Sequence, residues 1–143
     1  MLAKIHHVGV VVRDLEQAYG FWRDVLGLPV MVVKTVVDQD VTAALLKVGE
    51  SEIELLQPLS DKSGIGKFLA KRGEGLFELC LRTDDLAAAV EHMKAGGMRF
   101  TSDEPHILRD YEWKGEIFSE VHVMFVHPAS ANGAMIELQQ WHR

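Results

Sequence analysis

The first half of the chain combines short β-branched runs with one helical pattern. Residues 5–12 (IHHVGVVV) are such a run, which is typical of a strand. Asp14 follows as an N-cap with Gln17 three residues later, apolar residues recur at helical spacing over residues 15–26, and Gly27 ends the pattern. Apolar runs at residues 29–37, 41–48 and 52–57 predict three more strands, the last ended by Pro58.

The second half repeats this order. Residues 76–83 (LFELCLRT) predict a strand, and Asp85 caps a helix predicted over residues 86–95. A short strand at residues 98–101 and strands at 121–126 and 134–139 complete the series. Residues 105–119 are polar and irregular, which leaves open a strand or a loop over a site.

Matching positions indicate that the two halves are an internal repeat. His7 stands as far before Glu78 as Asp14 stands before Asp85, and Glu54 lies in an IEL triplet that recurs around Glu137. We therefore predict an α+β fold of two βαβββ modules that form a cupped mixed sheet in one domain of residues 1–143. Module one covers about 1–59, a linker with a short helix about 60–75, and module two about 76–143.

Composition narrows the possible functions. The chain has 143 residues, 48% of them hydrophobic and 25% charged, which is ordinary for a globular protein. Its net charge of −6 without a basic run argues against nucleic-acid binding, and no apolar run is long enough for a membrane helix. The single Cys80 excludes an internal disulfide, and the N-terminus reads as a strand rather than a signal peptide. We expect a cytoplasmic protein.

Four polar residues lie inside apolar strands at paired positions of the repeat: His7, Glu54, Glu78 and Glu137. Each Glu stands between two apolar residues, so its side chain faces away from the side that packs under a helix. If these faces converge, one imidazole and three carboxylates form a hard, mostly oxygen site for a cation. The alternative is a solvated sheet face with an ordinary strand histidine. The paired positions in the repeat favour the site.

Two weaker candidates concern substrate binding. Cys80 follows Glu78 by two residues and should share its face, although a buried hydrophobic role is the common alternative. His122 alternates with Met124 in a strand and is a candidate to line the same cup, against the alternative of a structural histidine. His6 should point to the face opposite His7.

Three segments resemble the vicinal oxygen chelate (glyoxalase/bleomycin resistance/dioxygenase) superfamily. IHHVGVVV resembles its opening strand, while IELLQPLSDKSGIGKFLAKRGEGL and FVHPASANGAMIELQQ resemble methylmalonyl-CoA epimerases. The resemblance implies one divalent metal ion (Mn, Co, Ni, Zn or Mg) bound by His7, Glu54, Glu78 and Glu137, with Glu137 also acting as the base.

The chain departs from the family pattern at two places. Phe77 and Glu78 replace a His pair, and the extra carboxylate favours harder ions such as Mn, Mg or Ca over Zn and Co. Ala43 aligns with the position of a catalytic Glu. A missing base would remove one of the two proton-transfer groups that epimerisation requires.

The resemblance implies a metal-dependent epimerase or isomerase of an acyl-CoA thioester, which removes a proton next to a metal-polarised carbonyl. A lactoylglutathione lyase, which converts a hemithioacetal into a glutathione thioester, is the second enzyme hypothesis. A ring-cleaving dioxygenase is disfavoured because only His7 is available on the first strands. A small-molecule binding protein of the bleomycin-resistance type, without turnover, is the alternative from another class. A homodimer is expected from the resemblance.

Overall fold

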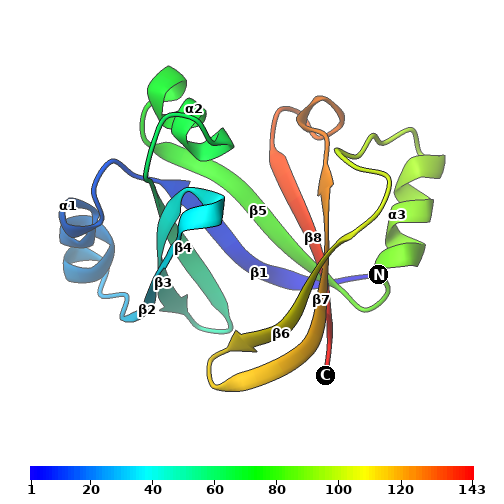
Figure 1. Cartoon of the computed structure of the whole chain (residues 1–143), viewed down its shortest axis with the longest axis horizontal. Helices are drawn as coiled ribbons and strands as arrows, with labels where there is room; N and C mark the ends of the chain where they lie inside the picture. Colours follow the sequence, from blue (N-terminus) through cyan, green and yellow to red (C-terminus); the bar gives the residue numbers. More distant parts are fainter. The chain divides into compact units, whose positions relative to one another are not determined.

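The computed structural model describes residues 1–143 and has an α+β fold with a mixed sheet, as predicted. Its elements, labelled in Figure 1, are β1 (Leu2–Val11), α1 (Leu15–Tyr19), β2 (Val30–Val36), β3 (Val41–Val48), β4 (Ser51–Pro58), α2 (Gly64–Arg72), β5 (Gly75–Thr83), α3 (Leu86–Ala95), β6 (His106–Trp113), β7 (Glu116–Val126) and β8 (Met135–His142). Two compact units divide the chain: His6–Glu78 forms one, and Leu79–Arg143 with Met1–Ile5 forms the other. The boundaries fall inside β1 and β5.

The unit His6–Glu78 holds the strand order β2-β3-β4-β1. β1 runs parallel to β4, while β3 pairs antiparallel with both β2 and β4. One face of these strands packs under α1 through a core of Val10, Leu55 and Leu46 with the helix residues Leu15 and Tyr19. This packing leaves the alternate residues of β1 and β4 on the opposite face.

The first helix is shorter than predicted. Asp14 caps it by accepting a hydrogen bond from the backbone N–H of Gln17, and Gly27 beyond its end has a φ of 75°. The α-helix nevertheless stops at Tyr19, and residues 20–25 continue as a π-helix. The sequence pattern identified the helical segment but not this change of winding, because the two windings differ too little over one turn for the spacing of apolar residues to separate them.

The segment between the modules contains the predicted short helix. Ser63 caps α2 by accepting a hydrogen bond from the N–H of Gly66. The apolar side of α2, formed by Ile65, Phe68 and Leu69, packs on a core that includes Val11 of β1. No helix in the structure has both the length and the apolar character needed to cross a membrane.

The second unit has the strand order β5-β8-β7-β6, with β7 antiparallel to both β6 and β8. Helix α3 has the predicted bounds, and its Leu86 packs against Met124, Val126 and Leu138. Figure 1 shows α3 beside this part of the sheet. The prediction of a short strand at residues 98–101 is wrong. Only an isolated β-bridge joins Phe100 to Val126, and the backbone on either side of Phe100 is loop.

The segment left open at residues 105–119 is a β-hairpin. Strand β6 and the start of β7 are joined by a turn in which Lys114 and Gly115 both have positive φ. Such a turn matches the twist of a hairpin. Strand β6 is the edge strand of the sheet and is largely exposed, so both of its faces carry polar residues. The alternation of apolar and polar residues that predicts a strand is therefore absent from its sequence.

The repeat extends to individual hydrogen bonds. The Oε1 atom of Gln57 accepts from the N–H of Leu15 at 2.8 Å, and Oε1 of Gln140 accepts from the N–H of Leu86, also at 2.8 Å. Asp85 caps α3 through the N–H of Ala88 as Asp14 caps α1. A Gln and an Asp therefore accept hydrogen bonds from the N-terminal N–H groups of both helices, and they stand at matching positions of the two halves.

Candidate metal centre

His7 lies on the face of β1 opposite the α1 core. It is buried, with 6% of its surface exposed, while its neighbours Val10 and Val12 pack under α1. Strand alternation places His7 and Gly9 on one side and Val10 and Val12 on the other. A buried imidazole needs hydrogen-bonding or ionic partners on its own side of the sheet.

Two carboxylates supply these partners. Nε2 of His7 lies 3.3 Å from Oε2 of Glu54 on β4 and 3.6 Å from Oε1 of Glu78 on β5. The three residues can present ligand atoms that all lie within 4.8 Å of one another. Three of the four ligands expected from the sequence thus meet inside the unit His6–Glu78.

Gly9 makes this approach possible. It pairs with Glu54 across β1 and β4. A Cβ atom on Gly9 would lie 2.6 Å from Cγ of Glu78, closer than real Cβ contacts. Sequence reasoning missed this residue, although a glycine inside a strand, two positions after His7, is the usual sign of a close approach by another group.

The charges of the cluster are unbalanced. Burial raises the pKa of Glu54 above its usual 4.5; the neighbouring His7 lowers it, and the negative charges of Glu78 and Glu52 raise it. One imidazole faces two carboxylates, so the ionised form of the cluster carries excess negative charge in a buried place. A divalent cation would remove this excess, and the imidazole and carboxylate donors fit such an ion.

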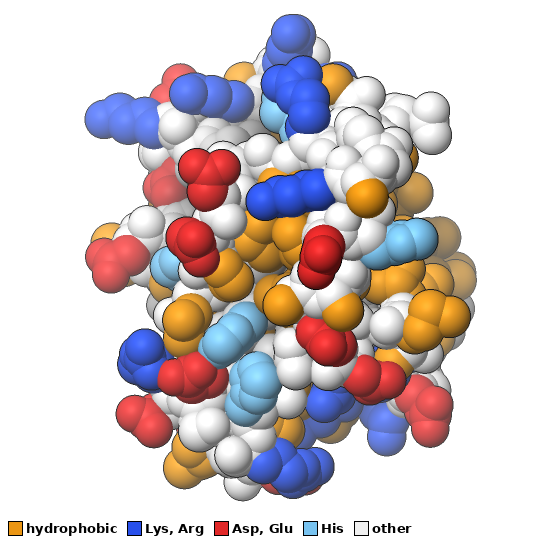
Figure 2. All heavy atoms as spheres, turned by 90° about the vertical axis from the view of Figure 1, so that its right-hand side faces the viewer, with side chains coloured by type: hydrophobic (Ala, Val, Ile, Leu, Met, Phe, Trp, Pro, Cys, Tyr) orange, Lys and Arg blue, Asp and Glu red, His pale blue; other side chains and the backbone are white.

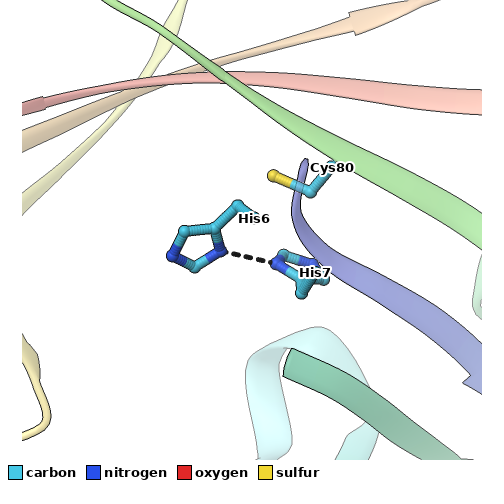
Figure 3. Close-up of side chains that lie close together, drawn as sticks. All are labelled: His6, His7 and Cys80. Atoms are coloured by element: carbon cyan, nitrogen blue, oxygen red, sulfur yellow. Dashed lines mark hydrogen bonds between the residues drawn. The ribbon is translucent and has the colours of Figure 1, made fainter. Parts of the chain in front are cut away.

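His6 and His7 touch each other. Their Nδ1 atoms are 2.9 Å apart, and the rings meet edge to face with centroids 5.2 Å apart (Figure 3). The prediction that His6 points away from His7 is therefore wrong. Both residues are buried, and the contact gives each Nδ1 a hydrogen-bond partner that water would otherwise supply.

Glu137, the fourth residue expected in the site, lies on β8 in the second unit. It is 8% exposed and accepts a hydrogen bond from Nε2 of Gln139 at 2.7 Å. Oε1 of Gln139 in turn accepts from the indole of Trp141 at 2.8 Å. These contacts hold the carboxylate in one orientation. Its roles as ligand and base remain predictions.

The two substrate-binding candidates have different surroundings. Cys80 is fully buried and forms no disulfide. His122 pairs with Gln140 and shares a strand face with Met124, which packs under α3, whereas Glu137 pairs with Phe125 on the other face. His122 therefore does not share the face of Glu137, because residues an odd number apart on a strand point to opposite sides. Substrate binding by either residue stays a prediction.

Ala43 contributes no polar group. It lies on β3 opposite Leu56 and packs in an apolar cluster with Val11 and Phe77. Two residues further along β3, Leu45 pairs with Glu54. Ala43 therefore shares the sheet face of Glu54 but offers only a methyl group to it.

Comparison with known proteins places the chain in a family. A model of the Glyoxalase/Bleomycin resistance protein/Dioxygenase superfamily matches residues 6–114. Mitochondrial methylmalonyl-CoA epimerase of Mus musculus is 35% identical over 140 residues, which are 97% of this chain and 74% of that protein. The chain belongs to this superfamily, in its methylmalonyl-CoA epimerase branch. An ethylmalonyl-CoA/methylmalonyl-CoA epimerase of Cereibacter sphaeroides is 33% identical over 142 residues, which are 98% of this chain and 99% of that protein.

Solved structures agree with the sequence relatives. Methylmalonyl-CoA epimerase of Mycobacterium tuberculosis superposes with a TM-score of 0.81 at 31% identity, covering 97% of this chain and 88% of that one. A variant of the Streptomyces coelicolor epimerase in complex with 2-nitronate-propionyl-CoA also reaches 0.81 at 31% identity, with 98% of each chain covered. The predicted glyoxalase-like fold and the family resemblance are thereby confirmed.

Proposed function

We propose that the protein is a metal-dependent epimerase of an acyl-CoA thioester of the methylmalonyl-CoA type. The observation that carries this proposal is the cluster of the buried His7 with the partly buried Glu54 and Glu78, in a member of the epimerase branch. The substrate class is supported by a structural relative in complex with methylmalonyl-CoA and by another in complex with 2-nitronate-propionyl-CoA. The epimerase names of these relatives favour this reaction over that of a lactoylglutathione lyase.

The metal would be held by His7, Glu54 and Glu78, with Glu137 as the proposed fourth ligand. A divalent ion held there would supply a Lewis acid for the thioester carbonyl and for the negative charge that develops on its oxygen. Because carboxylates outnumber imidazoles in this set, Mn or Mg is the proposed ion rather than Zn or Co. The Gly9 backbone leaves the room that the Glu78 carboxylate needs to reach His7.

Proton transfer is assigned to Glu137. Its carboxylate removes the proton next to the carbonyl and returns it, while Gln139 holds its orientation through the 2.7 Å hydrogen bond. Ala43 offers no second carboxylate, so delivery of a proton to the other face of the enolate falls to water. We therefore expect exchange of the substrate α-proton with solvent to outpace epimerisation.

The test is α-proton exchange of methylmalonyl-CoA in D₂O, followed by NMR on metal-stripped protein before and after addition of Mn, Mg, Co, Ni or Zn. We expect exchange only with metal, loss of exchange in Glu137→Gln, and faster epimerisation relative to exchange in Ala43→Glu. Glu16→Gln, an exposed change on α1, is the matched control and should leave all rates unchanged.

One further observation favours a second function. Because Ala43 places a methyl group where the family resemblance implies a base, a binding protein without turnover is the second candidate. Stoichiometric binding of methylmalonyl-CoA with no α-proton exchange in the presence of any of these metals would establish the binding protein and overturn the epimerase.

The proposed homodimer is tested separately by sedimentation.

A further inference from the structure

A pocket of about 630 Å³ lies in the second unit, away from the face of Glu137. Its walls are α3, residues 103–105, and the α3-facing side of β7 and β8, where Met124 and Gln140 contribute. Figure 2 looks onto this side of the molecule and shows apolar side chains in a hollow with acidic side chains around it. The volume is that of a small-molecule site.

The internal repeat shows one difference between the two units at this place. In the first unit, the buried ring of Tyr19, which is 5% exposed, fills the corresponding place between α1 and its sheet. The register that pairs Leu15 with Leu86 pairs Tyr19 with Val90, which lines the pocket. Valine has no aromatic ring. The second unit therefore lacks one ring at the point where the first unit carries one.

The polar groups around the pocket give it a charge preference. Glu91, Asp103 and Glu104 line it, and Lys94 is the one Lys or Arg among its lining residues. Their formal charges leave the pocket negative, which favours a cation. His142 also lines the pocket, and its Nε2 atom is buried without a hydrogen-bond partner.

We propose that this pocket is a second binding site, for a small aromatic cation. The ring of the ligand packs between Leu86, Val90 and Met124, where Tyr19 packs in the first unit. The cationic group lies toward Asp103 and Glu104. None of these residues belongs to the proposed metal centre, so the inference stands apart from the epimerase reaction.

Binding of two matched probes tests the site. Tyramine and 4-hydroxyphenylacetate share a phenol ring and carry opposite charges. We expect tyramine to shift the NMR signals of Leu86 and Met124 and to bind about tenfold or more tightly than the anion. Equal binding of both probes, or no shift at 10 mM tyramine (about 2.7 kcal/mol of binding free energy), would overturn the proposal.

Substitutions then locate the site. Val90→Tyr supplies the missing ring and is expected to abolish tyramine binding, whereas Ala88→Tyr, which adds the same ring on the exposed side of α3, is expected to leave it intact. If Val90→Tyr does not fold, Asp103→Asn with Glu104→Gln serves in its place, with an expected loss of about tenfold. Unchanged binding in these variants refutes the site. A change of oligomeric state with Val90→Tyr but not with Ala88→Tyr also refutes it, because it would assign the pocket to an interface between copies of the chain.

Discussion

Gly9 and Glu78 are packed so closely that a Cβ atom on Gly9 would lie 2.6 Å from Cγ of Glu78. The absence of a side chain on β1 therefore sets the position of a carboxylate on β5. Glu78 uses this space to bring Oε1 within 3.6 Å of Nε2 of His7. The geometry of the proposed metal site depends on a residue that has no donor atom of its own.

Gly9→Ala is accordingly expected to displace Glu78 and to weaken binding of Mn about tenfold or more, because a small displacement of one ligand loosens the whole site. Isothermal titration of the metal-stripped protein measures this. Gly20→Ala is the control: nothing lies within 4 Å of a Cβ atom there, and its φ is −54°. The control should bind metal normally and gain up to about 1 kcal/mol of stability.

Glu54→Gln is expected to stabilise the metal-free protein, and increasingly so as the pH rises. The pKa of Glu54 is raised in the folded state above the unfolded value near 4.5. The protonated Glu54 side chain therefore contributes its whole share of the folding free energy below pH 4.5, and this share is lost as the pH rises through the folded pKa. The loss is about 1.4 kcal/mol for each unit between the two values. Melting of both proteins between pH 4 and 8 tests this; a constant difference over that range would contradict it.

Glu78→His is expected to change the metal preference of the site. A second imidazole replaces a carboxylate, so affinity should move toward Zn and Ni and away from Mn and Mg. Competition between Mn and Zn, read by metal analysis of the dialysed protein, gives the ratio. Glu78→Gln, which removes the charge without adding a soft ligand, should lower the affinity for all of them. Identical ratios in wild type and Glu78→His would exclude Glu78 as a ligand.

His6→Phe is expected to lower metal affinity about 10- to 100-fold, because Nδ1 of His7 loses the partner that fixes its ring. Phenylalanine keeps an aromatic ring at this position. His106→Phe, an exposed change on β6, is the control and should have no effect. Ring ¹⁵N shifts of His7 in the metal-free variant report its tautomer, which a purely structural role of His6 would leave unchanged.

Gln57→Leu and Gln140→Leu should each destabilise the fold by about 1–3 kcal/mol, since each leaves the first N–H of a helix without its acceptor. Urea unfolding measures both changes. Gln17→Leu is the control: Gln17 is an exposed residue of α1, and only its backbone N–H takes part in the Asp14 cap. This change should alter the free energy of unfolding little. Markedly unequal effects of the two changes would show that the repeat does not extend to energetics.

The sequence determined the local pattern of this protein. Asp14 and Asp85 mark the N-termini of the helices that they cap. The alternation of apolar and polar residues around Glu54 indicates the sheet face on which its side chain lies. Both signals are local: a cap depends on the next three residues, and a strand face depends on the nearest neighbours. The recurrence of these signals at matching positions of the two halves was enough to identify the repeat and the two carboxylates that lie beside His7.

Only the tertiary structure decided what these local elements meet. The Gly9–Glu78 approach joins strands far apart in the sequence, and the His6–His7 contact depends on how two buried rings turn to satisfy their nitrogens. The sequence left open whether the segment of the edge strand β6 is a strand or a loop, because exposure removes the apolar alternation that marks a strand. The pocket beside Val90 likewise depends on how α3, residues 103–105 and the sheet pack together, and an empty volume leaves no signal in the sequence until these elements are packed.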